Sequence, residues 1–275
     1  MDDDTRRARA AAFATVADVY ERTRPGYPDA AVDWMLGPQP LRILELGAGT
    51  GKLTRSLAAR GHVVVATDPA GQMLAELVRA GLPVETTVAA AERLPFAAQN
   101  FDTVVVAQAL HWFDLAAALP EIARVLRPRG NLAAVWNVRD DSVPWVRRLT
   151  ALLRQANGSS AADDSLLETA MAGVERSPLF GPVESIRHRF WQQLDLQGLL
   201  GLVQSRSMVA LLDGEQRREL TQQVEALYAE YGRDRQGMRL PYVTHSFRTR
   251  VAPPPEPPPD PPGGTEDGDL LFDFR

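Results

Sequence analysis

The sequence contains no cysteine, and this absence excludes several classes of protein. Without cysteine the chain cannot form a disulfide-bonded scaffold, a thiol nucleophile, a zinc finger or an iron–sulfur cluster held by thiolates. Lysine is nearly absent too, because Lys52 is the only one and arginine carries almost all the positive charge. No stretch reaches the roughly 18 uninterrupted apolar residues of a membrane-spanning helix. The 275 residues are 45% hydrophobic, which is enough to bury a full-sized core.

Outside its C-terminal end, the chain carries equal numbers of acidic and basic residues. Residues 252–275 hold six acidic side chains and one arginine, which accounts for the whole net charge of −5. The rest carries 29 acids and 29 bases, so it offers no electrostatic footprint for nucleic acid or an anionic membrane. Residues 253–262 read PPPEPPPDPP, which favours an extended polyproline conformation and cannot build a core. We therefore predict a disordered acidic tail over 252–275, a candidate for weak binding of a protein partner.

Strand and helix signals alternate along the first half of the chain. Residues 102–107 read DTVVVA, an apolar run typical of a central strand covered on both faces. Amphipathic stretches that end at glycine or proline separate such runs. Strands are expected at 41–46, 62–67, 83–88, 102–107 and 132–136, helices at 13–20, 30–36, 53–60, 71–80 and 115–126, then long strands at 183–194 and 238–251 with a mostly helical stretch, 196–231, between them. The alternation predicts a doubly wound parallel α/β sheet.

A glycine-rich turn follows the first expected strand. Residues 44–51 read LELGAGTG, and glycines are needed where a backbone turns tightly and approaches a ligand closely. A phosphate-binding P-loop is excluded, because Leu46 stands where its first glycine belongs and Leu53 where its serine or threonine belongs. The dinucleotide fingerprint G-x-G-x-x-G is weakened but stays open, because Lys52 occupies the place of its third glycine. The spacing present is G-x-G-x-G, with Glu45 two residues before it.

Asp68 ends the second expected strand, 17 residues after Gly51. In a doubly wound sheet an acid at this position meets a ribose, so either class of adenosine cofactor would use it. The alternative is that Asp68 is the N-cap of the following helix, residues 70–80. Given the glycine turn, we favour ribose binding.

Five motifs then follow one another in the order of a known family. They are ELGAGTG (45–51), Asp68, AERLPF (91–96), FD (101–102) and VLRPRG (125–130). On these motifs residues 13–137 resemble the class I methyltransferases that depend on S-adenosylmethionine (SAM). Two further stretches, YERTRPGYP (20–28) and AQALHWF (107–113), are similar to the small-molecule branch related to trans-aconitate methyltransferases, as is LPYVT (240–244). The resemblance implies SAM as cofactor and a Rossmann-like, seven-stranded sheet whose last strand runs antiparallel.

The resemblance also assigns roles around the glycine turn. Gly47, Gly49 and Gly51 would let the loop pass under the methionyl part of SAM. Glu45 would orient this loop and the amino group of SAM, and Asp68 would bind the ribose hydroxyls.

On the adenine side, Met73 would flank the ring and Ala91–Glu92 would lie at its edge. Gln108, after the fourth strand, is grouped with these cofactor-binding residues. Two positions depart from the family pattern. Ala90 stands where many relatives carry aspartate, so Glu92 or a backbone carbonyl must contact the adenine amino group. Arg129 replaces a usual glycine, which costs little if its φ is negative.

Methyl transfer from a sulfonium is an in-line displacement with an activated donor, so the protein mainly supplies orientation. A general base is needed only if the acceptor must lose a proton, and a carboxylate acceptor has none to lose. His111 is the candidate catalytic residue, because it follows the fourth strand at the edge where ligands bind. The alternative is that His111 packs in an aromatic turn with its neighbours. No spacing resembles a metal site.

Substrate contacts are expected from two regions. Tyr20, Arg24 and Tyr27 form a small polar–aromatic cluster before the core. The resemblance suggests that Tyr20 and Tyr27 belong to a lid, and lids exclude water. Trp112 and Arg206 complete the expected substrate residues, and an arginine would pair with a substrate carboxylate through two hydrogen bonds. The alternatives are a helix that covers the sheet and a solvated surface arginine.

The expected organisation is one methyltransferase domain, residues 1–251, followed by the tail. Residues 1–40 form lid helices, 41–137 the SAM-binding core, and 138–251 the last strands with a helical substrate insert. We expect a SAM-dependent methyltransferase for a small-molecule acceptor, with a carboxylate or hydroxyl oxygen as target and without nucleic-acid or membrane partners. An NAD-type oxidoreductase and a non-catalytic SAM-binding protein are the alternatives. The acidic start of the chain argues against a secretory signal, so we expect a cytoplasmic protein.

Overall fold

A single seven-stranded sheet organises the computed structural model, which describes residues 23–157, 163–206, 209, 211–232 and 237–253. The strand order is β3-β2-β1-β4-β5-β7-β6. The strands are β1 (Arg42–Leu46), β2 (Val63–Asp68), β3 (Glu85–Val88), β4 (Phe101–Ala107), β5 (Leu126–Arg139), β6 (Glu184–Leu194) and β7 (Met238–Arg250). Strands β1 to β5 pair in parallel, whereas β7 runs antiparallel to both β5 and β6. The predicted doubly wound sheet with an antiparallel last strand is confirmed.

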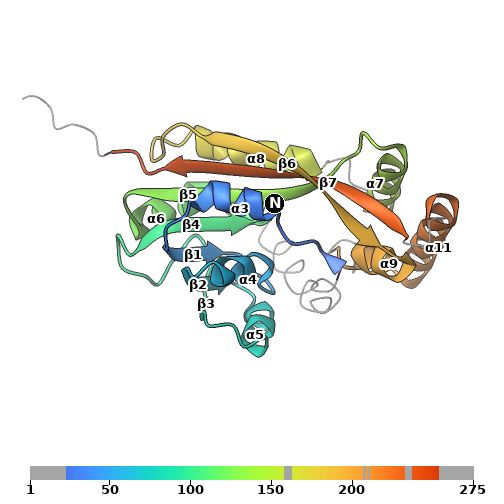
Figure 1. Ribbon diagram of the computed structural model, residues 1–275, viewed down its shortest axis with the longest axis horizontal. Coiled ribbons are helices and arrows are strands. Elements are labelled where there is room, and N and C mark those ends of the chain that lie inside the picture. The colour runs from blue at the N-terminus through green and yellow to red at the C-terminus, as the bar shows by residue number, and fades with distance from the viewer. Residues whose placement is uncertain (1–22, 158–162, 207–208, 210, 233–236, 254–275) are drawn as a thin grey trace, which may run out of the picture.

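Helices cover both faces of this sheet (Figure 1). One face is packed by α3 (Asp29–Leu36), α4 (Lys52–Ala59) and α5 (Gly71–Arg79), whose apolar side chains lie against β1, β2 and β5. The other face is packed by α6 (Leu115–Val125) and α8 (Asp163–Glu175). Because apolar side chains of β4 point to both faces, Val104 joins one core and Val105 the other. This explains the continuous apolar run of the central strand.

A second, smaller core lies beyond the carboxyl ends of the parallel strands (Figure 1). It consists of α7 (Pro144–Asn157), α9 (Leu196–Gln204) and α11 (Gly214–Tyr231), together with the ends of β6 and β7. We call these three helices the helical cap. Helix α11 begins with a capping box, in which Asp213 and Gln216 satisfy each other's backbone N–H groups. The cap therefore stands over the sheet edge at which doubly wound folds bind ligands.

Residues 23–28 connect the helical cap to the sheet, and we call them the strap. Its Thr23 carbonyl accepts a hydrogen bond from Gln192 Nε2 at 2.6 Å, and its Gly26 carbonyl accepts one from Asn137 Nδ2 at 2.9 Å. Helix α3, which follows, packs flat on the sheet with Val32 and Met35 buried. The first part of the expected lid, residues 1–22, lies outside the described residues. Of the rest of residues 1–40, the strap is the part that lies at the carboxyl edge of the sheet.

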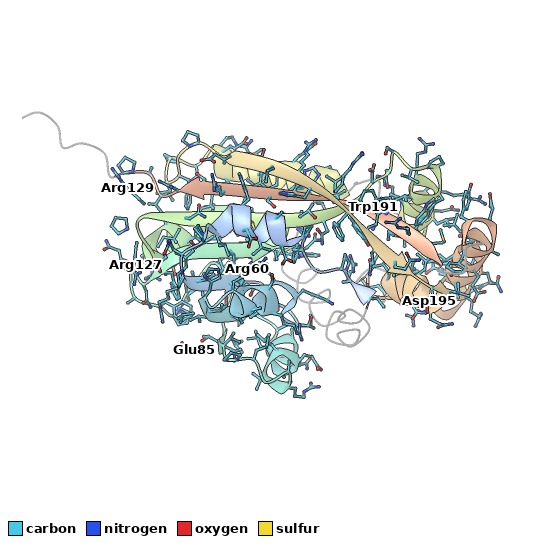
Figure 2. All side chains as sticks on the ribbon, in the orientation of Figure 1. Arg60, Glu85, Arg127, Arg129, Trp191 and Asp195 are labelled. Atoms are coloured by element: carbon cyan, nitrogen blue, oxygen red, sulfur yellow. The ribbon has the colours of Figure 1, made fainter. Side chains whose placement is uncertain are left out.

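The start of β5 differs from the prediction. The strand begins at Leu126 instead of residue 132, and its register with β4 shifts between Phe101 and Thr103 to accommodate the extra residues. Arg129 lies in this irregular part with φ of 61°, so the condition under which replacing the usual glycine costs little is not met. Arg127 and Arg129 lie together at the end of the sheet where β5 begins, opposite the helical cap (Figure 2). The strain at Arg129 is therefore remote from the ligand edge.

At this same end of the sheet, backbone hydrogen bonding continues past the end of β7. Val251 N donates to Gly130 O at 3.0 Å, and Ala252 N donates to Leu179 O at 2.9 Å. The predicted tail lies outside the described residues from position 254 onward. Within the described part of the chain, no helix has the length and apolar character needed to cross a membrane.

Candidate active site

The glycine turn between β1 and α4 adopts left-handed backbone at all three glycines. The φ angles are 68° at Gly47, 57° at Gly49 and 89° at Gly51. Side chains rarely adopt such angles, so the turn requires glycine. At Gly47 a Cβ would stand 2.6 Å from Ala109 Cβ, and at Gly51 it would stand 2.1 Å from Leu77 Cδ1. Two of the glycines are thus needed for packing within the protein.

Gly49 differs from its two neighbours. A Cβ there would meet Met73 Cε at 3.6 Å, which is an ordinary contact. At Gly49 the left-handed φ alone requires glycine, and the protein leaves the space beside this backbone open. A ligand could therefore approach the turn closely at this position. The same contact places Met73, which is 6% exposed in the first turn of α5, directly beside the turn.

Glu45 is buried in β1 directly before the turn. Its side chain is 1% exposed, and Thr54 Oγ1 on α4 donates a hydrogen bond of 2.6 Å to Oε2. Among the described residues, the buried Oε1 has no hydrogen-bond partner. Burial, with a smaller contribution from the nearby charge of Asp68, raises the pKa of Glu45 to about 8, although the hydrogen bond from Thr54 opposes the shift. Glu45 thus bonds to α4 instead of the loop, and one of its oxygens is left for a cationic partner.

Asp68 ties the glycine turn to the start of α5. Its Oδ2 accepts a hydrogen bond from Gly49 N at 3.0 Å, and its Oδ1 accepts one from Ala70 N at 2.8 Å. The N-cap of α5 is Ala70, which has no side-chain cap bond, so the alternative that made Asp68 the N-cap is wrong. Burial raises the pKa of Asp68 above its usual value, although both backbone bonds oppose this. Carboxylate oxygens accept more than one hydrogen bond, so ribose binding remains available to it.

On the expected adenine side, Ala91 is 5% exposed and Glu92 is partly exposed. Glu92 Oε1 accepts a hydrogen bond from Asp114 N at 2.8 Å, immediately before α6. Asp114 in turn caps α6 by accepting from Ala116 N. The carboxylate of Glu92 is therefore fixed in position, and its contact with an adenine amino group stays a prediction.

The segment after β4 borders the glycine turn. Gln108 has φ of 58°, an uncommon angle for this residue, and its Nε2 donates to Asn137 O at 3.2 Å. Next to it, Ala109 packs on Gly47 as described above. His111 and Trp112 follow in the short helix η1 (Leu110–Trp112), both half-buried. The Gln108 backbone is thus held in an unfavourable conformation beside the turn, as residues at functional sites often are.

His111 lies in an aromatic cluster. The centre of its ring is 4.6 Å from that of Trp112 and 5.9 Å from that of the buried Trp136 on β5. These contacts fit the alternative of a packed aromatic turn. The catalytic role of His111 stays a prediction, as does the substrate contact of Trp112.

Among the expected substrate residues, Arg24 of the strap bonds to a residue of the helical cap. Its Nε donates to Ser205 Oγ at 3.0 Å, and Ser205 is fully buried at the end of α9. The neighbouring Arg206 is half-buried, and Tyr27 packs partly against the core below α3. Tyr20 lies outside the described residues. The strap and the end of α9 are therefore brought together, although they lie far apart in the sequence.

Three polar residues at this edge were not assigned a role from the sequence. Thr54 bonds Glu45, Ser205 bonds Arg24, and Asn137 bonds the strap. Only Asn137 gave a usable signal, because it lies near the end of a parallel strand, where ligand-binding residues gather. The other two depend on contacts between distant segments.

The geometry fits SAM. An open position at Gly49, an unsatisfied buried oxygen on Glu45 and the Asp68 carboxylate suit a ligand with an amino group and a ribose. When bound, SAM supplies an activated methyl group on a sulfonium. The residues that would hold it are those predicted from the sequence: Glu45, Gly47, Gly49, Gly51, Asp68, Met73, Ala91, Glu92 and Gln108. In the described part of the chain, no group of acidic or histidine side chains could hold a metal ion.

This fold and site define a class I SAM-dependent methyltransferase. A family described as a methyltransferase domain matches residues 44–134. An uncharacterised methyltransferase of Mycobacterium tuberculosis is 39% identical over 251 residues, which cover 90% of this chain and 99% of the relative. An uncharacterised methyltransferase of Schizosaccharomyces pombe is 33% identical over 222 residues, covering 78% of this chain and 86% of the relative. The chain belongs to this family of methyltransferases, and SAM is its cofactor.

A solved structure also supports the methyltransferase assignment. A type II methyltransferase from Anaeromyxobacter dehalogenans superposes with a TM-score of 0.61 at 27% identity, covering 84% of this chain and 99% of that one. With the family established, an NAD-type oxidoreductase and a non-catalytic SAM-binding protein are no longer needed as alternatives.

Proposed function

We propose that this methyltransferase transfers the methyl group of SAM to an oxygen of a small-molecule acceptor, and that the acceptor oxygen belongs to a carboxylate. The motifs that resemble the trans-aconitate branch support a small acid. Relatives named malonyl-[acyl-carrier protein] O-methyltransferase, one of them from Enterobacter lignolyticus with 30% identity over 174 residues, support oxygen as the target. A small-molecule acceptor without nucleic acid or membrane, and a cytoplasmic location, belong to the same proposal.

The observation that carries the proposal is the hydrogen bond between Arg24 and Ser205. The bond at Nε fixes the plane of the guanidinium where the strap meets the helical cap. Arginine recognises carboxylates through two parallel hydrogen bonds, and a fixed plane makes such a pair specific. An arginine in this place suits an acceptor that is negatively charged.

The chemistry of the site favours the same conclusion. Glu45 and Asp68 are both bonded to the protein, and His111 is packed against two tryptophan rings. A hydroxyl or amine acceptor requires a base that removes a proton, whereas a carboxylate acceptor requires only orientation. A site that holds its acceptor by an arginine and lacks a dedicated base among these groups can methylate a carboxylate.

A panel of small carboxylic acids, tested beside the matching alcohols and primary amides, would test the proposal. The measured quantity is the release of S-adenosylhomocysteine from SAM. We expect turnover with at least one acid and none with its alcohol or amide. Turnover of alcohols or amines without turnover of acids would overturn the carboxylate assignment.

Two substitutions would then test the assigned roles. We expect Arg24→Gln to raise KM for the acid about tenfold or more, because the charged pair is lost, while Arg148→Gln on the exposed side of α7 leaves it unchanged. We expect His111→Gln to keep kcat within about tenfold, since a lost general base would cost about 10²–10⁴-fold. A larger fall in kcat with unchanged KM would make His111 the base.

A further inference from the structure

Asn137, near the end of β5, makes three hydrogen bonds that join three separate segments. Its Nδ2 donates to the strap at Gly26 O, 2.9 Å away. Its Oδ1 accepts from Thr244 Oγ1 of β7 at 2.7 Å, and its backbone oxygen accepts from Gln108 Nε2 at 3.2 Å. The side-chain amide and the backbone carbonyl are thus both used.

The orientation of the Asn137 amide is fixed by its partners. A backbone carbonyl only accepts hydrogen bonds, so the atom that faces Gly26 must be the amide nitrogen. The Thr244 hydroxyl, on a fully buried residue, then faces the amide oxygen as donor. The part-buried bond from Thr244 holds the amide in this one orientation, and the exposed bond to Gly26 O then fixes the strap relative to β5.

One of the three partners, Gln108, borders the glycine turn, and another, Gly26, belongs to the strap. Gln108 keeps its left-handed φ of 58° next to Ala109, which packs on Gly47 of the glycine turn. Gly26 belongs to the strap, whose Arg24 is anchored on Ser205 under the helical cap. Asn137 therefore links the Gln108 segment, which lies beside the turn, to the strap.

We propose that Asn137 is a positioning residue for SAM binding, which holds the strap and the Gln108 turn in the one arrangement that accepts the cofactor. Asn137 acts through Gly26 and Gln108, so it sets the shape of the site without contacting the methyl group. The inference rests on SAM as cofactor and is independent of the proposed acceptor.

The same strand supplies a matched control. Asn131 Nδ2 donates to Met35 O at 3.0 Å, at the opposite end of the sheet and far from the glycine turn. In both asparagines, Nδ2 thus donates to a backbone carbonyl of a residue near the N-terminus. A purely structural role predicts similar consequences when either one is changed.

The test compares Asn137→Asp with Asn131→Asp, using SAM itself as the titrated ligand in calorimetry at pH 8. We expect Asn137→Asp to weaken SAM binding about tenfold or more, because a carboxylate replaces the donor that faces Gly26 O. We expect Asn131→Asp to bind SAM within about threefold of the wild type, at a similar loss of thermal stability. Backbone amides of Gly26 and Tyr27 should exchange hydrogen faster in Asn137→Asp alone.

Lowering the pH supplies a rescue. A protonated aspartic acid regains a donor, so the ratio of SAM affinities between wild type and Asn137→Asp should shrink as the pH falls towards about 4, the ordinary pKa of aspartate. Equal SAM affinity of both variants and the wild type at pH 8, or equal losses in both variants, would overturn the proposal. If Asn137→Asp does not fold, Thr244→Val, which frees the amide oxygen, should weaken SAM binding in the same direction, and an unchanged affinity would again overturn it.

Discussion

Arg24 and Ser205 lie 181 positions apart in the sequence, and the Nε of the arginine donates a 3.0 Å hydrogen bond to the serine hydroxyl. Ser205 passes this restraint on to α9, because its own hydroxyl donates to Leu202 O at 2.7 Å. One fully buried hydroxyl thus joins the strap to the helical cap. The position of the Arg24 guanidinium is therefore restrained by a buried residue of the helical cap.

Ser205→Ala should separate the position of Arg24 from its charge. The substitution removes a buried hydroxyl that makes two hydrogen bonds, so we expect a loss of about 1–3 kcal/mol in the free energy of unfolding. Denaturant unfolding measures this loss. With an acid identified in the panel, KM for the acid should rise while the Kd for SAM stays near the wild-type value. An unchanged KM in a folded variant would show that Arg24 is oriented by other contacts.

Two glycines of the turn, Gly49 and Gly51, should respond differently to replacement by alanine. Gly49→Ala has room for its Cβ and carries only the cost of a left-handed alanine, about 1–2 kcal/mol. Gly51→Ala drives its Cβ into the fully buried Leu77, so we expect a larger fall in melting temperature. Both should lose SAM affinity, but Gly49→Ala should do so while still folded. Calorimetry that finds wild-type affinity in folded Gly49→Ala would show that no ligand approaches this position.

Local patterns predicted much of the fold and part of the site. The apolar run of β4, the glycine turn and the acid at the end of β2 are each visible within a few neighbouring residues. The partners Thr54, Asn137 and Ser205 could not be predicted, because their bonds join segments that only the tertiary fold brings together. The start of β5 was missed for a related reason. Pro128 and Gly130 indicate a loop, yet the register shift between β4 and β5 lets the strand accommodate them.

The left-handed Arg129 gives a prediction about stability alone. Replacing it by glycine relieves about 1–2 kcal/mol of backbone strain and costs about 0.4–1 kcal/mol through the more flexible unfolded chain. We therefore expect Arg129→Gly to raise the midpoint of denaturant unfolding without changing SAM binding. Arg129→Ala is the control, since it removes the charge and keeps the Cβ. An equal gain in the alanine variant would assign the effect to charge instead of to φ.

Glu45 should make the stability of the protein depend on pH. Its pKa is raised in the folded state to about 8 from a reference value of 4.5, so the folded protein binds this proton more tightly than the unfolded chain. The stability from protonated Glu45 is complete below about pH 4.5 and is lost as the pH rises towards 8, with a slope of up to about 1.4 kcal/mol per pH unit. Glu45→Gln, which mimics the protonated form, should lack this slope and be the more stable protein at pH 8.

The same proton should be coupled to SAM binding. The amino group of SAM is cationic, and a cation beside the unsatisfied Oε1 of Glu45 favours the ionised carboxylate. Binding at pH 7 should therefore release up to about one proton, and SAM affinity should rise with pH until Glu45 is ionised in the free protein. Calorimetry in two buffers of different ionisation enthalpy measures the release, and Glu45→Gln is the control. Equal proton release by the wild type and Glu45→Gln would mean that another group, such as Asp68, carries the linkage and that Glu45 does not meet the amino group of the cofactor.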